Sequence, residues 1–269
     1  MSVALLRDRA ILVAALVAGS LVAWIVTVQR MRGMDAGPGT DLGGLGWFVG
    51  IWVTMMAAMM LPSVSPMVLL FARVSRERAR KGLAELVPSW MFVGGYLLVW
   101  TAVGLAAYGL YRAIVSAGTE WLSWDSAGPY VAGAALVAAG IYQLTPLKDV
   151  CLRHCRSPLH FLLHDWREGR AGAVLMGVEH GAFCLGCCAG LMLALFALGV
   201  MSLFWMAVVA AVILVEKLAP GGRELSRVFA FALVGLGIWV SSAPASVPGL
   251  VQPNSPGAGM TRMHSTGMK

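Results

Sequence analysis

The sequence predicts an all-α protein, a polytopic helical membrane bundle of about seven transmembrane helices. Of its 269 residues, 59% are hydrophobic and only 12% are charged, whereas about 25% of the residues of a soluble domain are charged. The chain also contains several uncharged runs that are roughly as long as a bilayer span, about 17–25 residues. These runs do not alternate between apolar and polar residues, as the strands of a transmembrane barrel do.

Seven apolar segments are expected to span the membrane. In order, they are residues 10–28, 45–71, 87–111 and 130–147, two spans within 171–218 that divide near 199–202, and residues 225–240. An interfacial amphipathic helix is expected between the fourth and fifth spans. Its start is indicated by Ser157-Pro158, and its apolar stripe consists of Leu159, Leu162, Leu163 and Trp166. Residues 1–242 thus form one helical transmembrane domain, and residues 243–269, rich in Pro, Gly and Ser, form a disordered C-terminal tail.

The positive charges orient the predicted bundle. With seven spans, 15 of the 20 Lys and Arg residues fall on the side that carries the N-terminus, and 5 fall on the other side. The richer side is cytoplasmic by the positive-inside rule. We therefore expect an inner (cytoplasmic) membrane protein of a bacterium, with an uncleaved signal-anchor at the N-terminus and a periplasmic or external tail. Nucleic-acid binding is not expected, because no soluble basic domain carries the net charge of +7.

The segment HGAFCLGCCAG, residues 180–190, concentrates the residues that can bind a metal. If it is helical, His180, Cys184, Cys187 and Cys188 are spaced i, i+4, i+7 and i+8 and share one face about 100° wide. Thiolates together with an imidazole select Cu(I), Zn(II) or an iron–sulfur cluster. The alternative is tight helix packing, because Gly177-x-x-x-Gly181 and Gly186-x-x-x-Gly190 overlap the same stretch.

A second cysteine cluster precedes the first. Cys151 and Cys155 are four residues apart with His154 between them, and His160 and His164 follow. We expect Cys151, Cys155, Cys184 and either Cys187 or Cys188 to share a site, with His180 as an additional ligand. A disulfide is not expected on the reducing cytoplasmic side. The C-x-x-C spacing of residues 184–187 lacks the strand-to-helix context of a thioredoxin-type motif.

Four methionines lie in the second predicted span. Met55 and Met59 are stacked at i, i+4, and so are Met56 and Met60. Thioethers can coordinate Cu(I), although methionine is also a common space-filler in apolar helices. Pro62 follows them and leaves the carbonyl of Ala58 without its helical partner, so another group must satisfy it. Further methionines and a histidine are expected outside and could begin a copper path toward the cysteines: Met31, Met34, Met260, Met263, His264 and Met268.

Three ionisable residues lie within or at the end of predicted spans, where such groups are usually functional. Glu179 adjoins His180 and could support it as a hydrogen-bond partner or proton acceptor. Glu216 and Lys217 stand at the cytoplasmic end of the sixth span, where we expect a simple ion pair with an interfacial lysine.

Several segments together resemble a known family. They are MMAAMMLPS (55–63), YQLTPLKDVCLRHCRSP (142–158), HGAFCLGCCAGLM (180–192) and WMAVVAAVILVEKLAP (205–220). They resemble a bacterial family of predicted metal-binding integral membrane proteins, domain of unknown function 2182. The resemblance covers roughly residues 45–220 and implies a helical membrane protein that binds a metal. The family often has Trp after the double cysteine, where this chain has Ala189, a difference that concerns packing and not ligation.

Three classes of function follow. The first is binding of a soft metal, copper or alternatively zinc, for transport or for delivery to a metal-receiving membrane or periplasmic protein. The second is a non-catalytic membrane subunit or assembly factor, with a structural zinc or with cysteines that only pack. The third is a membrane enzyme of thiol or metal redox type, which is less favoured. No G-x-x-x-x-G-K-[ST] loop occurs, so ATP hydrolysis by that route is excluded.

Overall fold

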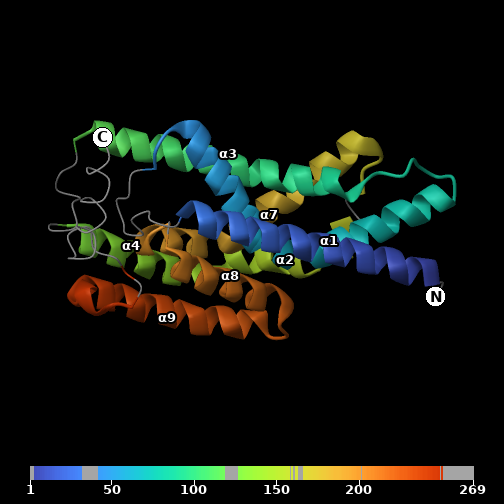
Figure 1. Ribbon diagram of the computed structural model, residues 1–269. Coiled ribbons are helices and arrows are strands. Elements are labelled where there is room, and N and C mark those ends of the chain that lie inside the picture. Colours follow the sequence, from blue (N-terminus) through green and yellow to red (C-terminus); the bar gives the residue numbers. More distant parts are fainter. Residues whose placement is uncertain are drawn as a thin grey trace, which may run out of the picture.

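The computed structural model describes residues 3–31, 42–118, 127–157, 159, 161–162, 166–200, 202–248 and 250. Within these ranges the regular elements are helices and no strand occurs (Figure 1), which confirms the all-α class. The helices are α1 (Val3–Met31), α2 (Leu45–Arg80), α3 (Ser89–Ser116), α4 (Gly128–Gln143), α5 (Pro146–Arg156), α7 (Gly169–Leu198), α8 (Leu203–Leu218), α9 (Gly222–Ser242) and the short 3₁₀ helix η2 (Pro244–Ser246).

The described residues contain five helices that are long and apolar enough to cross a membrane: α1 from residue 7, α2, α3, α7 and α9. A sixth candidate is formed by α4 and α5 if they are counted as one span, which bends by 64°. The expected sixth span corresponds to α8, which has 16 residues and is about 24 Å long at 1.5 Å per residue. The hydrocarbon core of a bilayer is about 30 Å thick. The described chain therefore offers five or six candidate spans where the sequence analysis expected seven.

The expected interfacial helix after Ser157 lies partly outside the described residues, as do His160 and His164. Of its predicted apolar stripe, Leu162 is buried and Leu159 is exposed. The structure has an amphipathic helix just before this segment, namely α5, which buries Cys151 and Leu152 against the bundle. The exposed residues of α5 are Pro146, Leu147, Val150 and Arg153, whereas Lys148 is buried.

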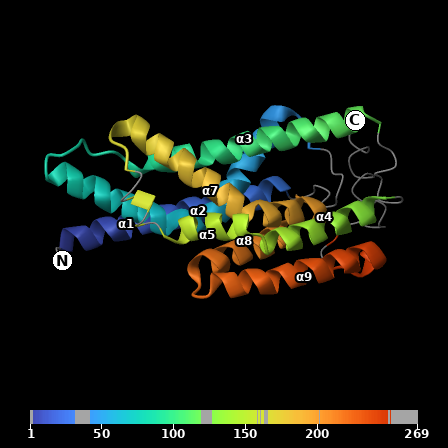
Figure 2. The same cartoon turned by 180° about the vertical axis from the view of Figure 1, so that it is seen from behind.

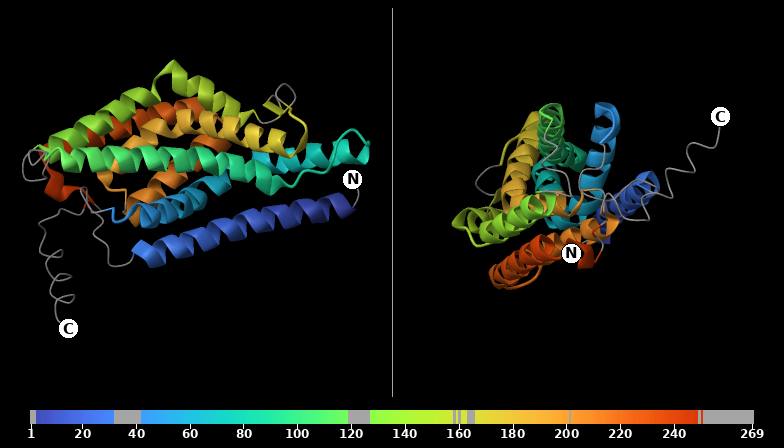
Figure 3. Two further views of the ribbon diagram at one scale, coloured as in Figure 1. Left: turned by 90° about the horizontal axis from the view of Figure 1, so that it is seen from above. Right: turned by 90° about the vertical axis from the view of Figure 1, so that its left-hand side faces the viewer.

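The helices run alternately in opposite directions, except that α5 continues the general course of α4 after the bend (Figures 1 and 2). The start of α1 lies at the same end of the bundle as the end of α2 and the starts of α3 and α7, whereas α9 ends at the opposite end. Figure 3 shows α1 on one flank of the bundle, along α2. The two shorter helices α4 and α8 end part-way along the bundle, so their carboxyl ends lie beside the middle of α7 (Figure 2).

Glycines allow two helix pairs to approach closely. A Cβ at Gly177 of α7 would lie 2.1 Å from the carbonyl oxygen of Phe92 of α3, and a Cβ at Gly95 would lie 2.1 Å from that of Val174. Gly133 of α4 and Gly237 of α9 meet in the same way. Only glycine permits such close contact between the two backbones. In a membrane no hydrophobic effect drives helices together, and their association depends on close packing of this kind. The small-residue packing expected at Gly177 therefore occurs, and it fixes how α7 is rotated.

Helix α2 continues through two prolines because serine hydroxyls replace the lost backbone donors. The carbonyl of Ala58, left free by Pro62, accepts a 2.9 Å hydrogen bond from the Ser20 hydroxyl of α1. The carbonyl of Pro62, left free by the proline at 66, accepts a 2.7 Å bond from Ser65. The expectation that another group must satisfy Ala58 is confirmed. The donor ties α1 to the middle of α2.

Replacement of Ser20 by alanine should lower the free energy of unfolding by about 1–3 kcal/mol, because it leaves the buried carbonyl of Ala58 without a donor. The measurement is denaturant unfolding of the purified protein in detergent. In a Pro62→Ala background the main-chain amide of residue 62 can donate to Ala58 instead, so the same Ser20→Ala change should cost much less. Equal losses in both backgrounds would show that the hydroxyl does not serve this carbonyl.

Candidate metal centre

Three cysteine thiols of α7 form a compact buried group. The Sγ atoms of Cys184, Cys187 and Cys188 all lie within 4.8 Å of one another, and those of Cys187 and Cys188 are 3.4 Å apart. None of the three side chains is more than 2% exposed. The α-helical spacing predicted from the sequence brings these residues together. Because α7 is held against α3 by Gly177 and its neighbours, the shared face turns into the bundle.

Helix α5, which follows α4 after a bend of 64°, adds a fourth thiol to this group. Pro146 starts the helix immediately after Thr145, whose hydroxyl accepts a hydrogen bond from the main-chain amide of Lys148. The Sγ of Cys155 then lies 3.7 Å from that of Cys187. Cys151 is directed elsewhere: a Cβ at Gly186 would lie 2.5 Å from its Sγ, so this thiol packs on the backbone of α7. The two expected clusters thus meet through Cys155.

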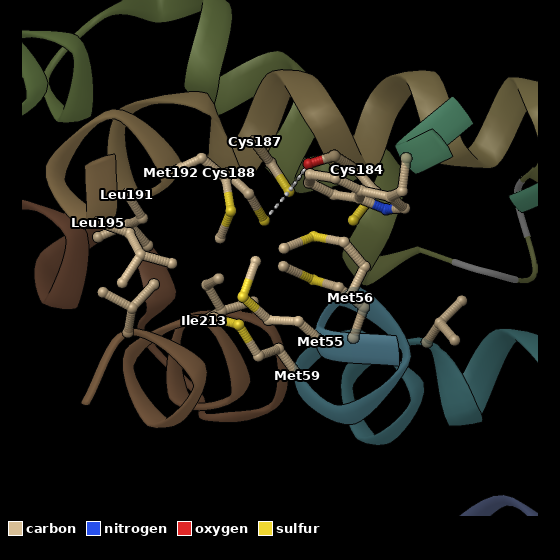
Figure 4. Close-up of a cluster of buried hydrophobic side chains, with 14 of the residues drawn as sticks. Met55, Met56, Met59, Cys184, Cys187, Cys188, Leu191, Met192, Leu195 and Ile213 are labelled. Carbon is tan, nitrogen blue, oxygen red and sulfur yellow. Dashed lines mark hydrogen bonds between the residues drawn. The ribbon is translucent and has the colours of Figure 1, made fainter. Parts of the chain in front are cut away.

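The methionines of α2 face the same space from the opposite side. Met55, Met56, Met59 and Met60 are each at most 1% exposed. In Figure 4, the first three extend from α2 toward the cysteines, and Met192 of α7 points into the same space. The remaining wall is apolar, formed by Leu191, Leu195 and Ile213 (Figure 4). Thiols and thioethers therefore line opposite sides of one buried volume. Met192, one helical turn after Cys188, was not singled out from the sequence.

His180 lies one turn before Cys184 on the same helix and is also buried. Its ring is surrounded by Phe92, Tyr96 and Phe161, with ring centroids 5.8–6.1 Å away. Its Nδ1 has no hydrogen-bond partner in the described part of the protein. Buried polar atoms are usually paired, so this nitrogen is available to a ligand. The expected metal donor is thus next to the thiols and free at one ring nitrogen.

Two polar groups contact Cys184 directly. The hydroxyl of Tyr96 and the ammonium of Lys217 each lie 3.0 Å from its Sγ, and Lys217 also donates to the hydroxyl of Ser63 at 3.2 Å. The prediction that Glu216 and Lys217 take part in a simple ion pair at the membrane surface is wrong. Adjacent residues on a helix point in different directions, and Lys217 turns inward to the thiols.

Glu216 pairs with another buried lysine. Its carboxylate accepts from the ammonium of Lys148 at 2.7 Å and from the amide of Gln143 at 3.0 Å. Arg156 donates to the main-chain oxygens of Glu216 and Ala219 at 2.8 and 2.6 Å, which satisfies carbonyls at the end of α8. This network holds the end of α8, and hence Lys217, beside α7. The other acidic residue considered, Glu179, is bonded to Arg167 at 3.4 Å.

The sequence analysis missed Lys217 as a residue of this site. A lysine at the end of an apolar run is equally well explained by snorkelling of its ammonium to the membrane surface. The available signal was that Lys148, Glu216 and Lys217 all stand at the ends of apolar runs. Their pairing could not be deduced, because it depends on the ends of α4 and α8 meeting at the middle of α7.

Residues 49–240 match the PpoB2 family, described as a copper chaperone. The chain belongs to the PpoB2 copper chaperone family. The match extends from the start of α2 nearly to the end of α9 and includes all five cysteines and the four α2 methionines. It agrees with the metal-binding character implied by the sequence resemblance, under a different family name. Neither the curated proteins nor the solved structures gave a match to the chain.

The donor set of this PpoB2-family chain fits a soft monovalent ion. Cu(I) is bound by thiolates and thioethers, whereas structural Zn(II) takes four N or S ligands and not thioethers. The site provides three mutually close thiols, a fourth thiol on Cys155 and a free imidazole nitrogen on His180. The α2 methionines that face these thiols add thioether sulfurs, which are weak and uncharged donors. The combination suits copper better than zinc, although the four thiols alone would satisfy either metal.

The different directions of Cys155 and Cys151 can be tested by cross-linking. A variant that retains only Cys155 and Cys187 should form an intramolecular disulfide under a mild oxidant, because the two sulfurs are in contact. A variant that retains only Cys151 and Cys187 should do so at least about tenfold more slowly, because Cys151 packs on Gly186 and disulfide geometry is strict. The measurement is the time course of free-thiol loss. Equal rates would contradict the described arrangement of α5.

Proposed function

We propose that this protein binds Cu(I) within a membrane-embedded helical bundle and delivers it to another protein. The observation that carries the proposal is the group of three buried thiols that faces the methionines of α2. The membership in a copper chaperone family supports it. In this proposal Cys184, Cys187 and Cys188 are the principal ligands, and Cys155 and His180 complete the set. Cys151 stays near the site without binding the metal.

The two kinds of sulfur suit a transfer in one direction. Thioethers bind Cu(I) without losing a proton and suit the oxidising exterior, whereas thiolates bind it more strongly and suit the reducing side. Copper that reaches Met55, Met56 and Met59 would pass on to the cysteines, because these bind it more strongly. The receiving protein then takes copper from the thiolates by exchange of ligands. Of the residues proposed as the start of this path, Met31 is the last residue of α1 and is buried. Met34, Met260, Met263, His264 and Met268 lie outside the described residues.

A non-catalytic role with a structural zinc is the second candidate. It is favoured by one observation, the approach of Cys155 to the thiols of α7, which makes four thiols available. A zinc site would not use the methionines that face the thiols, because structural Zn(II) does not take thioether ligands. The metal that the protein takes from an equal mixture of both ions separates these candidates.

Protein purified anaerobically and loaded from equal Cu(I) and Zn(II) should retain about one copper per chain. The variant Cys184→Ser/Cys187→Ser/Cys188→Ser should retain none, whereas Cys151→Ser should retain as much as the wild type. The readout is metal content by mass spectrometry after removal of loosely bound ions. Stoichiometric zinc in place of copper, or copper retained by the triple variant, would contradict the proposal.

The methionines are tested in the same assay. Replacement of Met55, Met56, Met59 and Met60 by leucine keeps volume and apolarity, so the fold should survive. The variant should bind copper in the same amount but load at least several-fold more slowly when copper is supplied from outside to proteoliposomes. Loading at the wild-type rate would mean that the methionines only pack.

We also propose that the protein lies in the inner membrane with its N-terminus in the cytoplasm. The charge distribution supports this orientation, and the alternating directions of the helices agree with it. Reporter fusions at Ala79 and Gly257 should report the cytoplasmic and the external side, respectively. The same side for both fusions would mean that α4, α5 or α8 does not cross as proposed.

A further inference from the structure

Lys217 is a buried cation in direct contact with the proposed metal ligands. It is 7% exposed, and its ammonium contacts the Sγ of Cys184 and the hydroxyl of Ser63. Within the described ranges, no carboxylate forms an ion pair with it. The neighbouring carboxylate of Glu216 is instead bonded to Lys148 and Gln143.

An unpaired ammonium in an apolar interior is expensive, because its hydration is lost and no opposite charge replaces it. The fold nevertheless holds Lys217 in this place, since α8 is fixed by the bonds of Glu216 and Arg156. The anion that offsets it must therefore come from the site itself. A copper–thiolate complex is such an anion: two thiolates with one Cu(I) carry a net charge of −1.

We propose that Lys217 is the built-in counter-cation of the metal centre and that it makes the centre selective for a monovalent ion. This inference rests on the proposed function and deepens it. When two of the three α7 thiols bind as thiolates, they are electrically neutral together with one Cu(I) and the ammonium, whereas the same two thiolates and the ammonium with Zn(II) leave an uncompensated positive charge. A third donor can then be neutral, and the thioethers of Met55, Met56 and Met59 face the thiols from α2.

The net charge of the centre depends on the number of thiolates, but the direction in which Lys217 shifts its selectivity does not. Whatever that number, the ammonium repels a divalent ion more strongly than a monovalent one at the same position. Removal of the positive charge must therefore shift the preference of the site from Cu(I) toward Zn(II). A lysine that only packs or only donates a hydrogen bond would change the affinities for both ions in the same direction and by similar factors.

The test compares the ratio of Cu(I) to Zn(II) affinity in the full-length protein and in Lys217→Met, which keeps the length and removes the charge. Affinities are measured anaerobically in detergent by competition with a chromogenic chelator for each ion. We expect the ratio to fall at least about tenfold in Lys217→Met, since one buried charge is removed. In Lys217→Arg, which keeps the charge, it should stay within about threefold. Ag(I), which is also soft and monovalent, should follow Cu(I).

Further variants separate charge from folding. Lys217→Gln also lacks the charge but can still bond to Ser63, so it should shift the ratio as Lys217→Met does and replaces that variant if the latter does not fold. The control is Arg76→Met/Asp8→Leu, which removes an ion pair of zero net charge between α1 and α2, takes no part in holding α8, and should leave the ratio unchanged. An unchanged ratio in the folded uncharged variants overturns the inference while the proposed function stands. A wild-type protein that binds no Cu(I) overturns the proposed function itself.

Discussion

The interior of the bundle is apolar, so a polar group buried there is costly unless another group of the chain pairs with it. This constraint accounts for most of the specific contacts between distant helices. The carbonyl freed by Pro62 is bonded by Ser20 of α1. The charges of Lys148 and Glu216 offset each other. Each of these contacts fixes one helix relative to another at a defined depth, which apolar packing alone would leave free to slide.

The site is formed where short helices end beside a long one. Helix α7 carries three thiols at its middle, and its glycine contact with α3 decides which way they face. Helix α4 stops at Gln143, and the 64° bend into α5 brings Cys155 to the thiols. Helix α8 stops at Leu218, which places Lys217 at the same level. The shortness of α4 and α8, which have 16 residues each, is therefore what brings polar residues at their ends into the core.

The sequence was sufficient for features with a local cause. The helical face shared by Cys184, Cys187 and Cys188 follows from their spacing, and the free carbonyl of Ala58 follows from Pro62. Features that depend on how helix ends meet could not be predicted. The choice of Cys155 over Cys151 depends on the bend between α4 and α5. Glu216 forms its ion pair with Lys148 and not with its neighbour Lys217, and the two paired residues are 68 positions apart.

Burial also explains why a metal carrier benefits from a permanent cation beside its thiolates. A thiolate cluster that loses its metal in an apolar interior would become an uncompensated anion, and release would be opposed by that cost. An ammonium that stays in place when the metal leaves offsets part of the remaining negative charge. The difference in free energy between the loaded and empty states is then smaller than in a site without it. In the proposed role, such a site holds copper less tightly than its thiolates alone would, which favours release of the ion to a receiving protein.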